Sequence, residues 1–403
     1  MVLRFLILML VCLLPFREGS PQVNAEDSSL KSIDSLVSKF IRDWNIPGAS
    51  LAMAKDGRLV YARAFGYADK ENREIVTPDH RFRIASLSKF ITAVAVMNLA
   101  EQGKLRVEDK VFGPAGILND PVYGKIKDKR LLQVTVRQLL QHTGGWDRDV
   151  SGDPMVGYGT DIARAMKVKA PADPQTVIRY MLGQKLDFTP GTKYSYSNLG
   201  YCILGRVIEK LSGMPYSNYV QTVLFAPLNI TAIQPGKNLY CDKLAGEVRY
   251  YDEGYTSSCY CDRSKVNWPY GGFNLEAMDA HGGWVASSRD FLKFIVSAGG
   301  SSGAAHIISP SSVKMMTSSC SLNSNYGMGC QVNSAGNIWH TGALPGSSSM
   351  MANLSNGISW VILLNGRPVD ANYYSALDEL MWKSIRSVKI WPSGDLFVKK
   401  SPS

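Results

Sequence analysis

The spacing of apolar residues predicts a helix followed by a hairpin near the start of the chain. Over residues 30–44, apolar side chains recur every third or fourth position, which is the period of an amphipathic helix. Two short runs with strand character follow, at residues 49–55 and 58–64. The Asp-Gly pair at positions 56–57 is a strong signal for a tight turn, so the two runs are predicted to pair.

The rest of the pattern places helices in the middle of the chain and strands near its end. A long, mostly apolar helix is expected over residues 86–102, and residues 105–235 are rich in helical patterns, proline and glycine. A last amphipathic helix is expected over residues 373–388. Because strands flank the helical segment at 105–235, the pattern predicts an α+β sandwich with an inserted helical lobe, whose two ends pack together. Four late strands are expected at 326–332, 338–343, 348–354 and 358–364.

The first 25 residues have the pattern of a secretory signal peptide. Arg4 precedes an apolar run over residues 5–16, and Ala25 offers a small residue for cleavage before Glu26. The run is shorter than the roughly 20 apolar residues that a membrane-spanning helix needs, and no later stretch indicates a membrane span. We therefore expect a mature domain of residues 26–403 that is secreted to the extracellular space or, in a bacterium, to the periplasm.

The positive charge of the chain does not indicate a nucleic-acid-binding protein. The chain has 44 lysines and arginines against 34 aspartates and glutamates. These basic residues are scattered, without runs or interleaved aromatic residues, whereas a nucleic-acid surface needs them clustered. We therefore expect no nucleic-acid partner.

The cysteines and two sequons predict covalent features of an exported chain. Five of the seven cysteines lie between residues 241 and 330, where disulfides are expected. Cys202 falls in an apolar helical pattern and is expected to be a buried free thiol. Asn229 and Asn353 begin Asn-x-Ser/Thr sequons that could carry glycans in a eukaryotic secretory route. No second close Cys or His pair accompanies Cys259 and Cys261, so no zinc site is expected. The expected bridges join Cys320 to Cys330, and Cys241 to Cys259 or Cys261.

A Ser-x-x-Lys pair occurs three times, and its context favours Ser86 with Lys89. The other copies begin at Ser28 and Ser311. Only Ser86 stands at the start of a long buried helix, where the spacing puts its hydroxyl and the Lys89 ammonium group on one face. The helix N-terminus favours negative charge on Ser86, and desolvation helps Lys89 to lose its proton. The pair therefore predicts a serine nucleophile with an adjacent base, although a helix N-cap followed by a solvated lysine would show the same spacing.

A Tyr-x-Asn motif occurs twice, and Tyr196 with Asn198 is the better candidate. This copy follows a Pro-Gly turn and precedes an apolar helical run, so it is expected in a loop held by a packed helix. A tyrosine beside a lysine can have a lowered pKa, which would qualify Tyr196 as a general base or proton shuttle. Asn198 is expected to orient Lys89 or a substrate amide. The copy at Tyr216 is expected to pack at the start of a helix.

A His-Thr-Gly motif also occurs twice, at residues 340–342 and from His142. Only the later copy lies in a strand pattern. Gly342 would let a substrate backbone approach closely, and the Ala343 amide is a candidate oxyanion donor. The copy at His142 ends a predicted helix and is interpreted as a structural turn.

A rival nucleophile motif, Gly-x-Ser-x-Gly, occurs at residues 299–303. The nucleophile elbow of α/β-hydrolases needs a strand before this motif and a helix after it. Here a helical pattern precedes the motif and a Ser/Gly-rich loop surrounds it, so Ser301 is not favoured as a nucleophile.

With these three motifs in this order, the chain resembles the serine β-lactamase and penicillin-binding-protein superfamily. It is most similar to the class C β-lactamase-related branch, which includes D-aminopeptidases, family VIII esterases and LACTB-like proteins. The resemblance covers nearly all of the mature chain. It implies an antiparallel β-sheet flanked by helices on both faces plus an inserted helical lobe, with the site in the cleft between them. Further stretches similar to this branch lie at 139–145, 190–201, 282–290 and 342–346.

The resemblance also implies a role for each motif residue. Ser86 would be the nucleophile and Lys89 its proton partner, while Tyr196 would be the base that also protonates the leaving group. The backbone amides of Ser86 and Ala343 would form the oxyanion hole. The reaction would pass through an acyl-enzyme on Ser86 that water hydrolyses, with a small-molecule or peptide substrate and without any metal or organic cofactor. The residues that would bind substrate are Asn198, His340, Thr341 and Gly342.

One departure from the superfamily pattern narrows the expected substrate. β-Lactamases and cell-wall carboxypeptidases usually have Lys-Thr-Gly where this chain has His340, and a histidine near its reference pKa of about 6.5 is mostly uncharged at neutral pH. The fixed charge that would meet a substrate carboxylate is therefore missing, which disfavours a β-lactamase or a D-Ala-D-Ala carboxypeptidase. We expect a secreted serine hydrolase of amides, peptides or esters. The alternative is a catalytically silent protein of this fold, used for binding or assembly.

Overall fold

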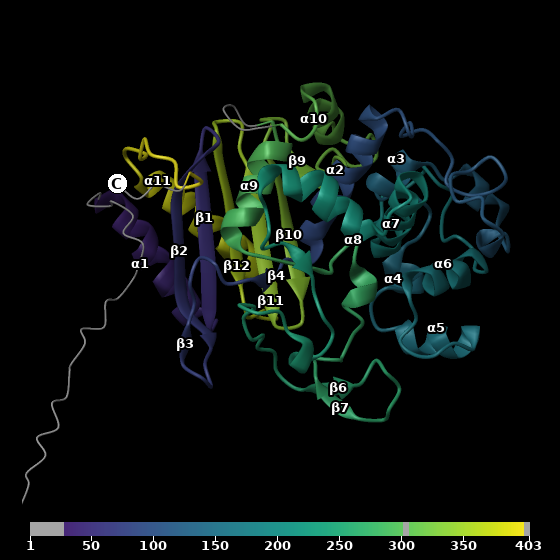
Figure 1. Ribbon diagram of the computed structural model, residues 1–403, viewed down its shortest axis with the longest axis horizontal. Coiled ribbons are helices and arrows are strands. Elements are labelled where there is room, and N and C mark those ends of the chain that lie inside the picture. Colours follow the sequence, from purple (N-terminus) through teal and green to yellow (C-terminus); the bar gives the residue numbers. More distant parts are fainter. Residues whose placement is uncertain (1–27, 301–305, 399–403) are drawn as a thin grey trace, which may run out of the picture.

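A seven-stranded antiparallel β-sheet forms the centre of the computed structural model, which describes residues 28–300 and 306–398. The strand order is β3-β2-β1-β12-β11-β10-β9, so strands from the two ends of the chain lie side by side (Figure 1). The predicted hairpin and the predicted packing of the two ends are both present. The predicted signal peptide lies outside the described residues. The strands of this sheet are β1 (Gly48–Lys55), β2 (Arg58–Asp69), β3 (Glu74–Ile75), β9 (Gln331–Val332), β10 (Ile338–Leu344), β11 (Ser347–Asn353) and β12 (Ile358–Leu364).

Helices cover both faces of this sheet, because its central strands are apolar on both sides. In β12, Val361 faces the larger core cluster and Ile362 faces the smaller one. The terminal helices α1 (Ser28–Asp43) and α11 (Tyr373–Ser387) pack together in the smaller cluster. Helix α9 (Ser288–Ala298) packs on the opposite face, against β1 and β12. The predicted α+β class, with helices on both faces of an antiparallel sheet, is therefore confirmed.

A group of helices lies beside the sheet and is built from the middle of the chain (Figure 1). Its centre is the pair α2 (Ser88–Glu101) and α7 (Asn198–Ser212), which pack against each other. Helix α2 is buried on nearly every side, which explains why its sequence is apolar all round. The surrounding helices are α3 (Val136–Leu140), α4 (Arg148–Ser151), α5 (Gly159–Met166), α6 (Pro174–Leu182) and α8 (Tyr216–Tyr219).

Smaller elements link the sheet to these helices. A three-stranded sheet, β4-β8-β5, stands directly before the start of α2, and β6 pairs with β7 in a separate hairpin. In the described part of the chain, no helix is both long and apolar enough to cross a bilayer. The remaining strands and helix are β4 (Phe82–Arg83), β5 (Gln234–Pro235), β6 (Tyr255–Ser257), β7 (Lys265–Asn267), β8 (Trp284–Ala286) and α10 (Pro310–Thr317). The short helical turns are η1 (Ala85–Leu87), η2 (Pro121–Tyr123), η3 (Lys129–Gln133), η4 (Val220–Phe225), η5 (Ala226–Leu228), η6 (Tyr240–Asp242) and η7 (Glu276–Met278).

The predicted strand at 326–332 is mostly wrong, since only Gln331–Val332 is a strand. Gly329 has a φ of 78°, which breaks an extended run. A Cβ at Gly329 would lie 2.9 Å from the Lys89 carbonyl oxygen, so this glycine lets the chain pass close to α2.

The predicted disulfides are absent from the structure, because the six cysteines of the described residues are free thiols. The Cys330 thiol packs in the larger core and lies 3.9 Å from the Met328 carbonyl oxygen. The backbone amide of Cys320 instead donates a hydrogen bond to the Tyr326 carbonyl oxygen. Cys202 is buried and free, as predicted.

The two sequons differ sharply in accessibility. Asn229 is exposed. Asn353 lies inside β11, is 9 % exposed, and its amide group bonds to the Gly299 carbonyl oxygen and the Ser359 hydroxyl. A glycan on Asn353 would need this strand to open, so the structure does not favour that sequon.

Candidate active site

A strained turn presents Ser86. The turn η1 joins β4 to α2, and Ala85 within it has a φ of 51°, a region that residues other than glycine seldom occupy. Helix α2 begins at Ser88 rather than at Ser86, and neither the turn nor the helix has a side-chain cap. Ser86 is partly exposed, so its hydroxyl is available to a ligand. The alternative interpretation of Ser86 as an ordinary N-cap is therefore not supported.

Lys89 lies one helical turn from Ser86 and is completely buried. Its Nζ is 3.3 Å from Ser86 Oγ, 2.7 Å from Asn198 Oδ1 and 2.8 Å from the carbonyl oxygen of His281. Burial lowers the pKa of Lys89 to about 7, so the neutral amine is well populated at physiological pH. A neutral amine has two N–H bonds and one lone pair. When the two carbonyl-type oxygens accept the N–H bonds, the lone pair is directed to the Ser86 hydroxyl.

Asn198 connects Lys89 to an acidic residue that the sequence did not reveal. Its Oδ1 accepts from Lys89, while its Nδ2 donates to Asp153 Oδ2 at 2.6 Å. Asn198 is the first residue of α7, where the Ser197 side chain caps the helix by accepting from the Gly200 amide. Both ends of the Asn198 amide are thus occupied, and its contacts are those of a residue that orients Lys89.

Tyr196 lies between the buried lysine and the solvent. The Lys89 Nζ is 4.8 Å from the centre of its ring, and the Arg148 guanidinium is 5.2 Å from that centre. Burial raises the pKa of Tyr196 well above its usual value, although hydrogen bonding with Ser86 acts in the opposite direction. The expected lowering of this pKa is therefore wrong, and Tyr196 is a neutral phenol at physiological pH.

His340 belongs to a chain of hydrogen bonds that ends at the other His-Thr-Gly copy. Its Nδ1 is 2.6 Å from the Thr341 carbonyl oxygen, and its Nε2 is 3.4 Å from the Tyr326 hydroxyl. That hydroxyl is also 3.0 Å from His142 Nε2. Burial lowers the pKa of His340 to about 4, so its ring is neutral at physiological pH. This lowered pKa agrees with the expectation that no fixed charge stands at this position.

Thr341 does not lie with the other predicted site residues. Neighbouring residues of a strand point to opposite faces, and His340 pairs with Met351 of the larger core whereas Thr341 pairs with Met350 of the smaller one. The Thr341 side chain therefore faces α11, on the side of the sheet away from Ser86. The prediction that this side chain contacts substrate does not agree with the structure.

Gly342 packs closely against the turn that carries Ser86, and the approach of a substrate backbone at this position stays a prediction. A Cβ at this position would lie 2.3 Å from Ser349 Oγ and 2.5 Å from the Ile84 carbonyl oxygen. Glycine is therefore needed so that the turn carrying Ser86 can pack on β10. Ala343 follows at the exposed end of β10, next to this contact.

Two of the decoy residues, Tyr216 and Ser311, lie elsewhere. Tyr216 is buried, and its hydroxyl bonds to Thr92 and to the Trp284 indole, so its predicted packing role is confirmed. Ser311 lies exposed in α10 and bonds to Ser309. Ser301, the rival nucleophile, is outside the described residues.

Sequence reasoning missed several residues around Lys89. Asp153 and Arg148 lie in loops and short helices without a recognisable pattern, and His281 contributes only its carbonyl oxygen to Lys89. His142 could have been found from the sequence, because it begins the second copy of the His-Thr-Gly motif. Its φ of 56° agrees with the predicted turn. Within the described residues, no group of three or more His, Cys, Asp or Glu side chains lies close enough to hold a metal ion.

The fold and the order of the motifs are those of a β-lactamase-like protein. A family model described as Beta-lactamase matches residues 33–379. Since this match covers most of the chain, the chain belongs to the beta-lactamase family, and the resemblance inferred from the sequence is confirmed.

Two curated relatives show how far the similarity extends. Protein flp of Staphylococcus aureus (strain COL) is 27 % identical over 205 residues, which are 51 % of this chain and 38 % of flp. The chain thus spans well under half the length of that relative. A protein of Escherichia coli O157:H7 named "Putative D-alanyl-D-alanine carboxypeptidase" is 25 % identical over 342 residues, 78 % of this chain and 75 % of that protein.

Solved structures share the fold. The D-amino acid amidase from Ochrobactrum anthropi SV3, complexed with L-phenylalanine amide, superposes with a TM-score of 0.66 at 22 % identity, over 89 % of this chain and 99 % of the amidase. The octameric penicillin-binding protein homologue from Pyrococcus abyssi gives a TM-score of 0.65 at 23 % identity, over 88 % of this chain and 77 % of the homologue. At these identities the likeness concerns the fold alone.

Proposed function

We propose that the protein is a secreted serine hydrolase that cleaves amide or ester bonds through an acyl-enzyme on Ser86. The observation that carries the proposal is the position of Lys89, a buried amine with a pKa of about 7 placed 3.3 Å from the Ser86 hydroxyl. A serine needs such a base to attack a carbonyl carbon. The similarity in fold to a D-amino acid amidase supports an amide of a small amino acid or peptide as substrate.

In the acylation step, Ser86 Oγ forms a bond to the substrate carbonyl carbon, and its proton passes to the neutral Lys89 amine. The backbone amides of Ser86 and Ala343 would donate to the resulting oxyanion. Tyr196, a neutral phenol, would give its proton to the leaving nitrogen or oxygen as the bond to it breaks. The Lys89 ammonium group then returns a proton to Tyr196. Water attacks the ester on Ser86 by the same proton transfers in reverse order.

A second candidate is a hydrolase of peptides that end in a carboxylate, and Arg148 is the observation that favours it. His340 is neutral, but the exposed Arg148 guanidinium lies over the Tyr196 ring at the entrance to the site. A guanidinium at that point could bind a carboxylate through two parallel hydrogen bonds. The alignment with a protein named as a carboxypeptidase agrees with this candidate.

The first experiment is labelling of the purified protein with a fluorophosphonate probe, followed by peptide mapping of the adduct. We expect one adduct on Ser86, its loss in Ser86→Ala, and unchanged labelling in Ser311→Ala, which removes the exposed decoy of the same motif. No adduct on a folded protein would contradict the proposal and favour a silent binding protein, whereas an adduct that persists in Ser86→Ala would contradict it by showing a different nucleophile.

Substrate comparison then separates the two candidates. A D-amino-acid amide and a p-nitrophenyl ester test the first candidate, while a D-Ala-D-Ala peptide and nitrocefin test the second. At a pH well above the Lys89 titration, the Arg148→Met variant should lose activity on the carboxylate substrates while keeping it on the amide and the ester if the second candidate is correct, and should keep activity on all four if the first is correct.

A further inference from the structure

A pocket lies between strands β10–β12 and helix α11, on the face of β10 that points away from Ser86. It encloses about 550 Å³, a volume in the range of small-molecule sites. Trp339 and Thr341 of β10 line it, and these residues point away from Ser86. The pocket is therefore separate from the candidate active site, and a ligand bound in it would not depend on the proposed function.

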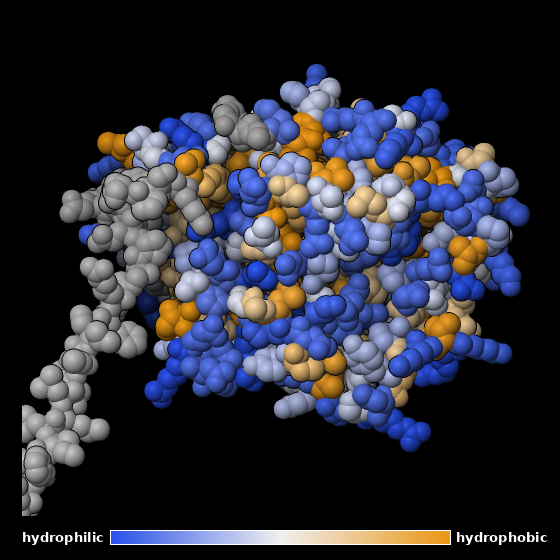
Figure 2. Space-filling model, in the orientation of Figure 1, coloured by the Kyte–Doolittle hydropathy of each residue, from blue (hydrophilic) through white to orange (hydrophobic). Residues whose placement is uncertain are grey.

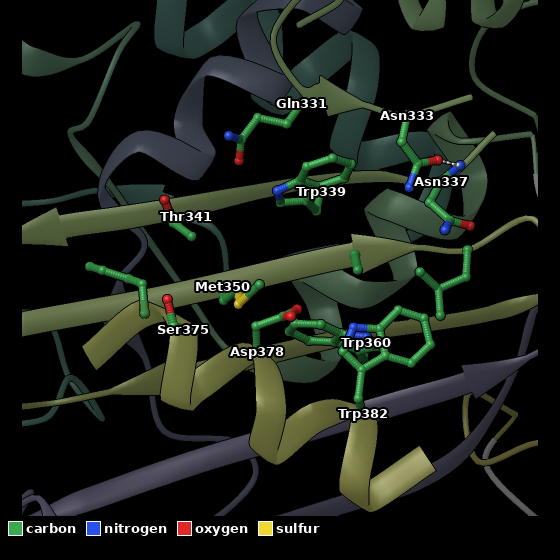
Figure 3. A pocket seen from close by; sticks show the side chains of 13 residues that line it. Gln331, Asn333, Asn337, Trp339, Thr341, Met350, Trp360, Ser375, Asp378 and Trp382 are labelled. Atoms are coloured by element: carbon green, nitrogen blue, oxygen red, sulfur yellow. Dashed lines mark hydrogen bonds between the residues drawn. The ribbon is translucent and has the colours of Figure 1, made fainter. Parts of the chain in front are cut away.

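The pairing register of strands β10, β11 and β12 determines which side chains form the floor of this pocket. Trp339 of β10 pairs with Ala352 of β11, which in turn pairs with Trp360 of β12. A small alanine thus separates two indoles in one row across three strands. Trp382 of α11 adds a third indole, and Figure 3 shows Trp339 on one side of the space with Trp360 and Trp382 on the other. The result is a cavity bounded by aromatic side chains.

Polar groups enter the same space from two directions. Helix α11 directs Ser375 and Asp378 toward the strands, while Asn333 and Asn337 approach from the turn between β9 and β10 (Figure 3). The Asn333 Oδ1 accepts from the backbone amides of residues 335 and 337. The Asn337 Oδ1 accepts from the amide and hydroxyl of Ser355. Both carboxamide oxygens are occupied locally, so both –NH₂ groups remain as donors for a ligand.

The charged residues that line the pocket indicate which class of ligand it can bind. The described residues that line the pocket include neither lysine nor arginine, which disfavours an anion. Asp378 is the single acidic residue among them, and its carboxyl group already accepts a hydrogen bond from the Trp382 side chain. A cation would therefore have only this one carboxyl group as a charged partner, which disfavours a cation as well. An entirely apolar ligand would leave the –NH₂ groups of Asn333 and Asn337 and the remaining acceptor positions of Asp378 unused, which is unfavourable.

A sugar ring meets all of these conditions. Its hydroxyl groups both donate and accept, so they match two amide donors and one carboxylate acceptor. Its C–H face carries a weak positive charge, which the negative faces of indole rings attract. From this combination we propose that the pocket between α11 and strands β10–β12 is a binding site for a neutral oligosaccharide, with the Trp339 indole stacking on the sugar and Asp378 accepting from its hydroxyls.

Calorimetric titration tests the proposal, with cellotriose, chitotriose and maltotriose as probes and choline chloride as a cation. The Ser86→Ala protein is used so that turnover does not contribute. We expect at least one trisaccharide to bind with one site per chain and choline not to bind. Trp339→Ala should weaken the affinity at least about tenfold, because truncating a central aromatic contact removes much of the binding energy. Asp378→Asn should weaken it less.

Two variants provide controls for folding and location. Trp268→Ala removes another partly exposed tryptophan, far along the chain from the pocket residues, and should leave the affinity unchanged. Ala352→Leu keeps the pocket's polar groups but fills its floor, and should abolish binding while the thermal unfolding transition remains cooperative. Binding of choline alone, no binding of any trisaccharide, or sugar binding that survives Trp339→Ala would each overturn the proposal.

Discussion

The Tyr326 hydroxyl lies 3.0 Å from His142 Nε2, and this contact determines the proton positions beside the candidate active site. His142 Nδ1 accepts from the Ser197 backbone amide, so the ring proton of His142 is on Nε2 and is donated to Tyr326. The Tyr326 hydroxyl proton is then available to His340 Nε2, which lies 3.4 Å away. The His340 Nδ1 proton goes to the Thr341 carbonyl oxygen. These five groups, from the Ser197 amide to the Thr341 carbonyl oxygen, form one hydrogen-bond chain with a single direction.

Removing the Tyr326 hydroxyl should disturb both histidines. In Tyr326→Phe the buried His142 N–H loses its acceptor, which costs about 1–3 kcal/mol of folding free energy. His340 loses a hydrogen-bond donor at Nε2, while the Thr341 carbonyl oxygen 2.6 Å from Nδ1 still holds the ring proton there. Nitrogen chemical shifts should therefore show that the Nδ1–H form persists and that the Nε2 resonance moves. Because His340 lies beside Tyr196, we also expect kcat to fall about tenfold, the effect of a barrier higher by about 1.4 kcal/mol. Tyr255→Phe, at a side chain that is 76 % exposed, is the matched control and should change none of these quantities.

The pKa of Lys89 predicts the pH dependence of catalysis. Only the neutral amine can accept the Ser86 proton, so kcat/KM should rise with pH with a midpoint near the Lys89 pKa of about 7. Lys89→Met should lower kcat by about 10²–10⁴-fold, the range expected for loss of a general base. A profile without an ionisation near neutrality would indicate that another group is the base.

Two charged neighbours should move this midpoint in opposite directions. The Asp153 carboxylate raises the pKa of Lys89 and the Arg148 guanidinium lowers it. Asp153→Asn should therefore move the midpoint to lower pH, and Arg148→Met should move it to higher pH. Asp161→Asn removes an exposed acid that pairs with Arg164 and should leave the midpoint unchanged. Shifts of the same sign in the Asp153 and Arg148 variants would show that the titrating group is not Lys89.

Packing at Gly342 should couple stability to activity. In Gly342→Ala the new methyl group meets the Ile84 carbonyl oxygen and Ser349 Oγ, so the turn that carries Ser86 must move away from β10. We expect a loss of about 1–3 kcal/mol, as for an overpacked core, together with weaker fluorophosphonate labelling of Ser86. Gly159→Ala is the control, since no atom lies within 4 Å of a Cβ at that position. Equal labelling rates in the Gly342 and Gly159 variants would mean that this contact does not position the nucleophile.

The sequence predicted the parts of the site that depend on local order. Ser86 with Lys89 and Tyr196 with Asn198 each lie within one helical turn or loop, so spacing alone brings each pair together. The outward position of Thr341 also follows from strand alternation, because a neighbouring His340 that faces the site requires it. Strand alternation is therefore a better guide to Thr341 than its place in the motif.

Other features depend on contacts between distant segments. Arg148 and Asp153 come from the short helix α4 and the loop after it, and Tyr326 comes from the segment before β9. No periodic pattern marks these segments. The raised pKa of Tyr196 has the same origin, since burial by other segments outweighs the nearby lysine. The bridge between Cys320 and Cys330 was predicted because cysteines of exported proteins often form disulfides. In the structure both thiols are free, and the Cys330 thiol packs in the larger core.

Three buried neutral histidines should make the protein sensitive to mild acid. Burial lowers the pKa of His340 to about 4, and it lowers the pKa values of His142 and His281 well below the usual value. In the unfolded chain each histidine binds a proton below about pH 6.5. Between about pH 6.5 and the folded pKa values the unfolded state therefore holds more protons, so stability is fully present above about pH 6.5 and decreases as the pH falls.

Urea unfolding at two pH values measures this loss. Three such histidines should together reduce the free energy of unfolding by about 3–4 kcal/mol between pH 7 and about pH 5.5, a window above the titration of ordinary carboxylates. His340→Gln should reduce the pH-dependent loss by about one third. His306→Gln, at an exposed side chain, is the control and should leave the loss unchanged. A free energy of unfolding that stays constant between the two pH values would show that these rings bind protons equally in the folded and unfolded states, so that burial does not keep His340 neutral below about pH 6.5.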